Sequence, residues 1–141
     1  MAFNKVEIWQ MMKDNDGHDV IFLRDDRGKI LSISIGTCEA AAIWIKLSPD
    51  FATSIVRRPW SHDLIVSFLQ KVGATISRVE IDNVVESTFY STIRIMYKNK
   101  DIIADARPSD AIAIALRVGA DIYVDDSIMD EAGFFPGENN I

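Results

Sequence analysis

The sequence has only one cysteine and two histidines among its 141 residues. Cys38 cannot form a disulfide within one chain, and without a Cys/His cluster the sequence contains no zinc-finger motif. It also lacks an apolar stretch long enough to cross a membrane, and its first residues do not form the apolar segment typical of a secretory signal. These absences exclude a disulfide-stabilised scaffold and predict a cytoplasmic protein without a membrane span, because a free thiol stays reduced in the cytoplasm.

Basic residues are also scarce: the chain has 15 Lys and Arg against 21 Asp and Glu, a formal net charge of −6. Residues 1–117 contain 15 residues of each sign, and the surplus acidic residues follow at Asp121, Asp125, Asp126, Asp130, Glu131 and Glu138. Because Lys and Arg supply most of the affinity for phosphate backbones, the chain is expected to bind nucleic acid poorly without a specific site. Any such contact must use a local basic patch, with the acidic C-terminal part pointing away from it.

Apolar periodicity and turn residues divide the chain into strands and helices. Short or alternating apolar segments predict strands at residues 6–12, 20–23, 30–35, 76–85, 89–97, 102–106 and 122–124. Helical spacing predicts helices at residues 37–47, 61–72 and 108–118, with a short one near residues 127–133. Thr37, Ser61 and Ser127 are expected to cap three of these helices.

Strands in a run, followed by helices placed between hairpins, are typical of an α+β fold rather than of a regular βαβ repeat. The chain shows no internal repeat and no linker composition. We therefore expect a single domain over residues 1–133, with three to four helices packed on a curved mixed or antiparallel sheet. Residues 134–141 are expected to form a disordered tail.

The segment Asp105–Asp110 joins a predicted strand to a predicted helix through a proline. It places two carboxylates, a guanidinium and a hydroxyl at one helix start, where free backbone N–H groups attract anions. Arg107 can hold a phosphate through two parallel hydrogen bonds, and the carboxylates can hold Mg²⁺ or a similar cation. In the plainer interpretation, Asp110 and Ser109 cap the helix. Arg107 then pairs with Asp105, and the residues alone leave both interpretations open.

The segment Arg57–Asp63 has the same design, with a basic loop, a proline and the start of the next helix. Histidine titrates near neutrality, so His62 can act as a general base. Arg57 and Arg58 can contact phosphates, and Trp60 can stack on a base. Alternatively, the polar residues are ordinary surface residues of the first helical turn, and Trp60 packs into the core.

Other local signals are weaker. Glu39 lies in the first turn of an Ala-rich helix, where a carboxylate is electrostatically favoured even without a catalytic role. Asp14, Asp16 and Asp19 resemble part of a calcium-binding loop, but no Glu completes the spacing, so we discount a calcium site. The sequence contains no glycine-rich phosphate loop and no nucleophile elbow of the Gly-x-Ser-x-Gly type.

The order of several segments is recognisable. They are Ile35–Ile43 (IGTCEAAAI), Arg58–Leu64 (RPWSHDL), Thr88–Tyr90 (TFY), Asp105–Ala113 (DARPSDAIA) and the ending Ile122–Gly133. Across residues 5–133 this order resembles the bifunctional nuclease domain family. Two positions depart from the family pattern, since Ser61 stands where Thr is usual and Asp121 stands where Pro is usual. Neither change removes a candidate catalytic group.

The resemblance implies a compact α+β domain that forms homo-oligomers and has a DNase and RNase activity proposed for the family. The family-typical polar positions map onto Glu39, Arg58, His62, Asp63, Asp105, Arg107, Ser109 and Asp110.

A first hypothesis is a metal-assisted nuclease that hydrolyses phosphodiester bonds of DNA or RNA. The expected catalytic residues are Glu39, His62, Asp63 and Asp110. The expected substrate-binding residues are Arg58, Arg107 and Ser109. Asp105 and Asp110 are the expected ligands of Mg²⁺ or Mn²⁺.

A second hypothesis is a non-catalytic module that binds a small anion or organises a subunit interface, and so regulates a partner. The acidic net charge and the lack of an extended basic stripe favour it. Both hypotheses include a homo-oligomer, because the chain is rich in apolar residues and its three tryptophans cannot all lie at the centre of so small a domain.

Overall fold

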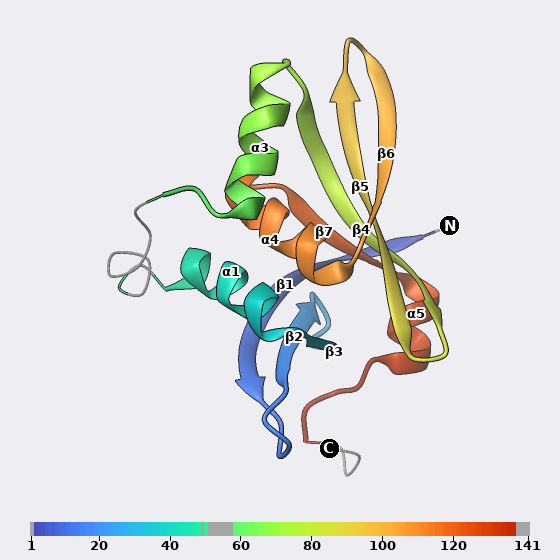
Figure 1. Cartoon of the computed structure of the whole chain (residues 1–141). Helices are drawn as coiled ribbons and strands as arrows, with labels where there is room; N and C mark the ends of the chain where they lie inside the picture. The colour runs from blue at the N-terminus through green and yellow to red at the C-terminus, as the bar shows by residue number, and fades with distance from the viewer. Residues whose placement is uncertain (1, 49, 51–57, 138–141) are drawn as a thin grey trace.

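One mixed β-sheet forms the framework of the molecule (Figure 1). The computed structural model describes residues 2–48, 50 and 58–137, and all structural statements concern these residues. Seven strands lie within them: β1 (Phe3–Lys13), β2 (Asp19–Asp25), β3 (Ile30–Ile35), β4 (Thr75–Val85), β5 (Thr88–Tyr97), β6 (Lys100–Ala106) and β7 (Asp121–Asp125). Their order across the sheet is β3-β2-β1-β7-β4-β5-β6.

The sheet joins two antiparallel halves through one parallel contact. The strands β1 to β3 form a meander, and β4 to β6 form a second one. The last strand, β7, lies between the halves, antiparallel to β1 and parallel to β4. Two register shifts interrupt the pairing of β4 with β5, which agrees with the irregular apolar pattern of residues 76–85. The expected α+β fold with a mixed sheet is confirmed.

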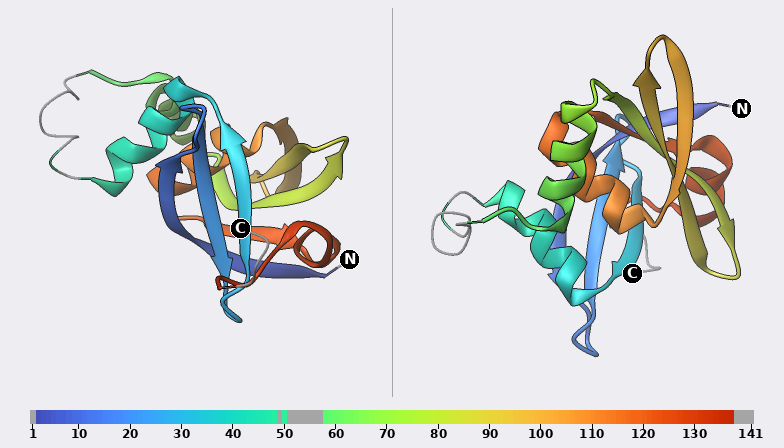
Figure 2. Two further views of the ribbon diagram at one scale, coloured as in Figure 1. Left: turned by 90° about the horizontal axis from the view of Figure 1, so that it is seen from below. Right: turned by 45° about the horizontal axis from the view of Figure 1, so that its top comes forward.

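The helices described are α1 (Thr37–Leu47), α3 (Ser61–Lys71), α4 (Pro108–Val118) and α5 (Asp126–Ala132). Helix α4 packs against β4 and β5, and α1 and α3 both pack against α4 (Figures 1 and 2). Every residue from Ala111 to Ala115 is buried, which explains the many small side chains on α4. Burial of Ile112, which has no exposed surface, contributes roughly 1.5–3 kcal/mol to stability.

The helix starts differ in detail from the expected caps. Thr37 and Ser61 are the first helical residues rather than caps, and neither α1 nor α3 has a capping hydrogen bond from the residue before it. In α3 the carboxylate of Asp63 instead reaches back and accepts a hydrogen bond from the Trp60 N–H. In α5 the cap is Asp125, whose carboxylate accepts from Ser127 N. The carboxylates of Asp63 and Asp125 thus form the capping hydrogen bonds that were expected from the hydroxyls of Ser61 and Ser127.

The first residues of the expected tail lie on the sheet. Phe134 exchanges two backbone hydrogen bonds with Ile30, of 2.7 and 2.9 Å, and so extends the sheet beyond β3. The Nζ atom of Lys29 lies 5.6 Å from the ring centroid of Phe135. The rest of the expected tail, residues 138–141, lies outside the described residues.

None of the helices within the described residues is both long and apolar enough to cross a membrane.

Candidate functional site

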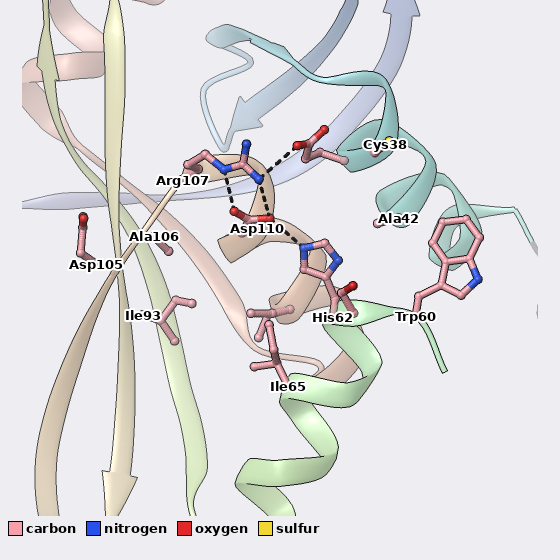
Figure 3. A pocket seen from close by; sticks show the side chains of 13 residues that line it. Cys38, Ala42, Trp60, His62, Ile65, Ile93, Asp105, Ala106, Arg107 and Asp110 are labelled. Atoms are coloured by element: carbon pink, nitrogen blue, oxygen red, sulfur yellow. Dashed lines mark hydrogen bonds and ion pairs between the residues drawn. The ribbon is translucent and has the colours of Figure 1, made fainter. Parts of the chain in front are cut away.

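The first turns of α1, α3 and α4 meet around one cavity of about 690 Å³ (Figure 3). The volume lies within the range of small-molecule sites. Helix α1 contributes Cys38 and Glu39, α3 contributes Ser61 and His62, and α4 contributes Asp110. The apolar part of the wall consists of Ala42, Trp60, Ile65, Ile93, Ala106 and Ile114. Three helix starts that are far apart in the sequence therefore share one pocket.

Asp110 is the centre of the polar cluster. Its Oδ1 lies 2.8 Å from His62 Nε2, across 48 residues of sequence. Arg107 donates from Nε to Oδ2 at 2.8 Å and from Nη2 to Oδ1 at 3.3 Å. Pro108 at the start of α4 suits the first helical position and sets Asp110 in the first turn. Both carboxylate oxygens of Asp110 are therefore engaged.

Glu39 joins the cluster from α1. Its Oε1 lies 3.1 Å from Arg107 Nη2, so the guanidinium bridges two carboxylates. The Glu39 carboxylate lies over Gly36, where a Cβ atom would overlap with it. A side chain at position 36 would therefore have to push the Glu39 carboxylate aside.

The charges of the cluster stabilise one another. Burial tends to raise the pKa of Asp110, but hydrogen bonds from Arg107 and His62 outweigh it and the pKa is lowered. The hydrogen bond and charge of Asp110, followed by the charge of Glu39, raise the pKa of Arg107. Around neutral pH, Arg107 offsets one of the two carboxylate charges. The cluster then carries one net negative charge when His62 is neutral.

Exposure differs strongly among these side chains. The His62 side chain is 12% exposed and that of Asp110 is 27% exposed. Arg107 is 66% exposed, so it is the charged group of the cluster that an incoming ligand reaches first.

Asp63 lies outside this pocket, although the sequence placed it among the catalytic candidates. Its Oδ1 accepts from Arg117 Nε at 2.7 Å and its Oδ2 accepts from the Trp60 N–H at 2.9 Å. Burial tends to raise its pKa, but the Trp60 N–H and the charge of Arg117 outweigh it and the pKa is lowered. Asp63 thus caps the start of α3 and ties this helix to α4.

Asp105 borders the pocket, but its side chain points the other way. In the register of β5 with β6, Ile93 pairs with Ala104 and Thr92 pairs with Asp105. Because side chains alternate between faces along a strand, Asp105 shares the face of Thr92 and not that of buried Ile93. Figure 3 shows it across the strand from Ala106 and away from Asp110. The structure does not bring the expected metal pair together.

The pocket does not fit a divalent cation as its residues are arranged. Among the described residues, the one group of three candidate ligand atoms within 4.8 Å is Asp14, Asp16 and His18, in the exposed turn between β1 and β2. In the pocket, both oxygens of Asp110 accept hydrogen bonds and Glu39 is paired with Arg107. A cation would have to displace a guanidinium to reach them.

The expected substrate-binding residues are spread over three places. Arg107 lines the pocket, whereas Ser109 is buried and lines a neighbouring pocket. Arg58 is exposed and is not part of either wall. Arg57 lies outside the described residues.

Arg117 was missed by sequence reasoning. Its side chain is 2% exposed, and besides Asp63 it binds the backbone carbonyls of Ala42 at 3.0 Å and Ala113 at 2.9 Å. In the sequence it appears as an ordinary basic residue in the last turn of a helix. The available signal was its spacing, because it lies four residues after Ala113 on the apolar side of α4.

Comparison with known proteins adds the family. The family model described as the bifunctional nuclease domain matches residues 20–136. An uncharacterised protein of Mycobacterium tuberculosis is 37% identical over 126 residues, which cover 86% of this chain and 71% of that protein. Bifunctional nuclease 1 of rice, Oryza sativa subsp. japonica, is 26% identical over 120 residues, which cover 83% of this chain and 36% of the rice protein. The chain belongs to the bifunctional nuclease domain family.

Proposed function

We propose that this protein is a nuclease that hydrolyses phosphodiester bonds of DNA or RNA in the pocket formed by α1, α3 and α4. The observation that carries the proposal is the contact of His62 with Asp110, next to the exposed Arg107. Family membership and the name of the rice relative support the same activity.

His62 is the proposed general base. Because the ionised Asp110 can only accept, it holds a proton on His62 Nε2 and leaves Nδ1 as the basic nitrogen. Nδ1 takes the proton of the attacking water as the new P–O bond forms. The bond to the leaving oxygen breaks, and solvent protonates that oxygen. Asp110 acts by orienting the ring and by stabilising the imidazolium that forms.

Arg107 is the proposed phosphate ligand. Its guanidinium can turn from the two carboxylates towards a phosphodiester, whose negative charge grows in the transition state. Glu39 keeps the guanidinium in place when no substrate is bound, and Asp63 supports the base by holding the start of α3.

The experiment compares the two histidines of the chain. His62→Ala should lower kcat/KM for single-stranded DNA and RNA by roughly 10²–10⁴-fold, the usual contribution of a general base. His18→Ala is the matched control, because His18 lies in the exposed β1–β2 turn, and it should leave cleavage unchanged. Equal activity in wild type and His62→Ala would show that the cleavage comes from elsewhere.

Metal dependence is tested in the same assay. Mg²⁺ or Mn²⁺ would act at this site only by displacing Arg107 from Asp110 and Glu39. We therefore expect cleavage to persist in EDTA and to change little when Mn²⁺ is added. If cleavage strictly requires the ion in the wild type, and Asp110→Asn no longer responds to the ion, then the ion does displace Arg107 from the carboxylates.

A second candidate function is a non-catalytic module that binds an anion. One observation weighs against catalysis: Arg107 is already paired with two carboxylates, so the cluster is satisfied without a substrate. This alternative predicts that nucleotides shift the NMR signals of the pocket while purified protein cleaves no substrate under any ion condition.

We also propose that the domain forms a homo-oligomer through α3. Leu64, Phe68 and Val72 form a stripe four residues apart, with exposed fractions of 45%, 60% and 61%. The stripe is symmetric about Phe68. Two antiparallel copies of α3 would therefore pair Leu64 with the partner's Val72 and place the two Phe68 rings together, as a two-fold interface requires.

The cytoplasm is the proposed location, because the exposed free thiol of Cys38 stays reduced there. Cell fractionation should recover the protein with cytoplasmic markers, and recovery from the secreted fraction would contradict this.

A further inference from the structure

A second pocket lies next to the first, at the other side of Arg107. It has a volume of about 380 Å³ and lies between the end of β3, the turn joining β4 to β5 and the start of α4. Its wall is rich in hydroxyl groups, which come from Ser32, Ser34, Ser87, Thr88 and Ser109. The activity proposed above makes no use of this pocket.

Arg107 lines both pockets. Because its side chain is 66% exposed, a group bound to the guanidinium is open to the first pocket on one side and to the second on the other. The two sides differ in chemistry. The first is bounded by apolar side chains such as Trp60, Ile65 and Ile93, and the second combines hydroxyl groups with apolar side chains such as Phe89.

These features match the parts of a polynucleotide chain. A nucleobase has flat aromatic faces, which can stack on apolar and aromatic walls. Serine and threonine hydroxyls donate hydrogen bonds to phosphate and sugar oxygens. A phosphodiester at Arg107 has a nucleoside on each side of it.

We infer that the two pockets form one groove that binds single-stranded nucleic acid across two adjacent nucleotides. The base of one nucleotide occupies the first pocket, the phosphodiester lies on Arg107, and the neighbouring sugar and its next phosphate contact the hydroxyl-lined pocket. The strand must be single, because a base has to leave its stack to enter a pocket of this kind. The inference rests on the proposed function and specifies its substrate.

The charge of the groove adds a second expectation. Arg107 is the one Lys or Arg among the residues that line the two pockets within the described part of the chain. A single phosphate contact on a single strand gives a slope of about −0.7 in log K against log[salt]. Binding should therefore depend only weakly on salt, unlike binding to an extended basic surface.

The test compares two probes of equal charge. Thymidine 3′-phosphate methyl ester and dithymidine monophosphate each carry one phosphodiester, and they differ by the second nucleoside. NMR titration of the wild-type protein should show at least tenfold tighter binding of the dinucleotide, with probe integrity checked by chromatography. The salt slope is measured with a single-stranded thymidine oligonucleotide, for which it should lie near the single-contact value.

A blocking variant locates the second nucleoside. Thr88→Trp fills the mouth of the hydroxyl-lined pocket from an exposed position, and Thr75→Trp is the matched control at the far end of the same hairpin. Thr88→Trp should abolish the advantage of the dinucleotide and leave the binding of the methyl ester unchanged. Thr75→Trp should behave as the wild type.

Equal binding of both probes by the wild type would overturn the inference, and so would a dinucleotide advantage that survives in Thr88→Trp. These measurements do not need turnover. A dinucleotide advantage without any His62-dependent cleavage would support the groove and reject the nuclease. Cleavage that depends on His62 without a dinucleotide advantage would reject the groove and leave the nuclease in place.

Discussion

Asp110 accepts hydrogen bonds from both Arg107 and His62, and these bonds keep its pKa below the ordinary value although burial acts in the opposite direction. A carboxyl group with a lower pKa in the folded than in the unfolded chain stabilises the fold at pH values above its unfolded pKa. That stabilisation is lost as the pH falls through the folded value. The cluster is therefore expected to be weakened by acid rather than by base.

This gives a prediction at the scale of the residue. Asp110→Asn should be less stable than the wild type at pH 7, because the ionised carboxylate is missing. The difference should shrink below about pH 3.8, the ordinary pKa of Asp. Urea denaturation at pH 7 and at pH 3 measures it. Asp16→Asn, at an exposed position in the β1–β2 turn, is the control. A difference that is as large at pH 3 as at pH 7 would contradict the role assigned to the ionised carboxylate.

At the scale of the elements, Arg117 joins the three helices that carry the site. Its guanidinium binds Asp63 of α3 and the carbonyls of Ala42 in α1 and Ala113 in α4. The helices carry Glu39, His62 and Asp110 in their first turns. One buried arginine that lies outside the pocket thus contacts all three helices that carry these side chains.

Arg117→Met should lower the free energy of unfolding by about 2–4 kcal/mol, because it leaves the partly buried Asp63 without the guanidinium that neutralises it. Adding Asp63→Asn should recover part of the loss, since the uncompensated charge is then removed. The variants should also shift the NMR signals of the His62 ring.

The control is Lys71→Met, at an exposed position in the last turn of α3, which should change stability by less than about 0.5 kcal/mol. If Arg117→Met loses stability while the His62 signals stay in place, the arginine supports the fold but does not position the base.

At the scale of the whole molecule, the apolar stripe on α3 leads to a prediction about assembly. Light scattering over the range from 1 to 100 µM should show a dimer or a larger oligomer of the wild type. Val72→Glu places a charge in the stripe and should shift the protein towards the monomer. Val85→Glu is the matched control, because Val85 is also exposed but lies at the end of β4. A wild type that is monomeric throughout this range would refute the proposed interface.

The acidic residues near the C-terminus that the structure describes lie away from the proposed groove. Asp125 and Asp126 belong to the end of β7 and the start of α5, whereas the pocket lies at the starts of α1, α3 and α4. Among the described residues, none of the surplus acidic residues lines either pocket of the proposed groove. This arrangement matches the expectation that a nucleic-acid contact would use a separate local site.

Features with local causes could be predicted from the residues alone. Alternation along β3 and β5, the proline at the start of α4 and the glycine after it depend on neighbours within a few residues. The same local chemistry marked Glu39, His62 and Arg107 as polar residues at helix starts. Each of these features could be identified without knowing where the other segments of the chain lie.

How these side chains combine depends on contacts between segments that are far apart in the sequence. The contact of His62 with Asp110 spans 48 residues, and that of Arg117 with Asp63 spans 54. Proximity in sequence grouped Asp105 with Asp110, whereas the register of β6 on β5 places Asp105 on the face of Thr92. Such pairings depend on the free energy of packing distant segments together, and no local pattern of residues contains that information.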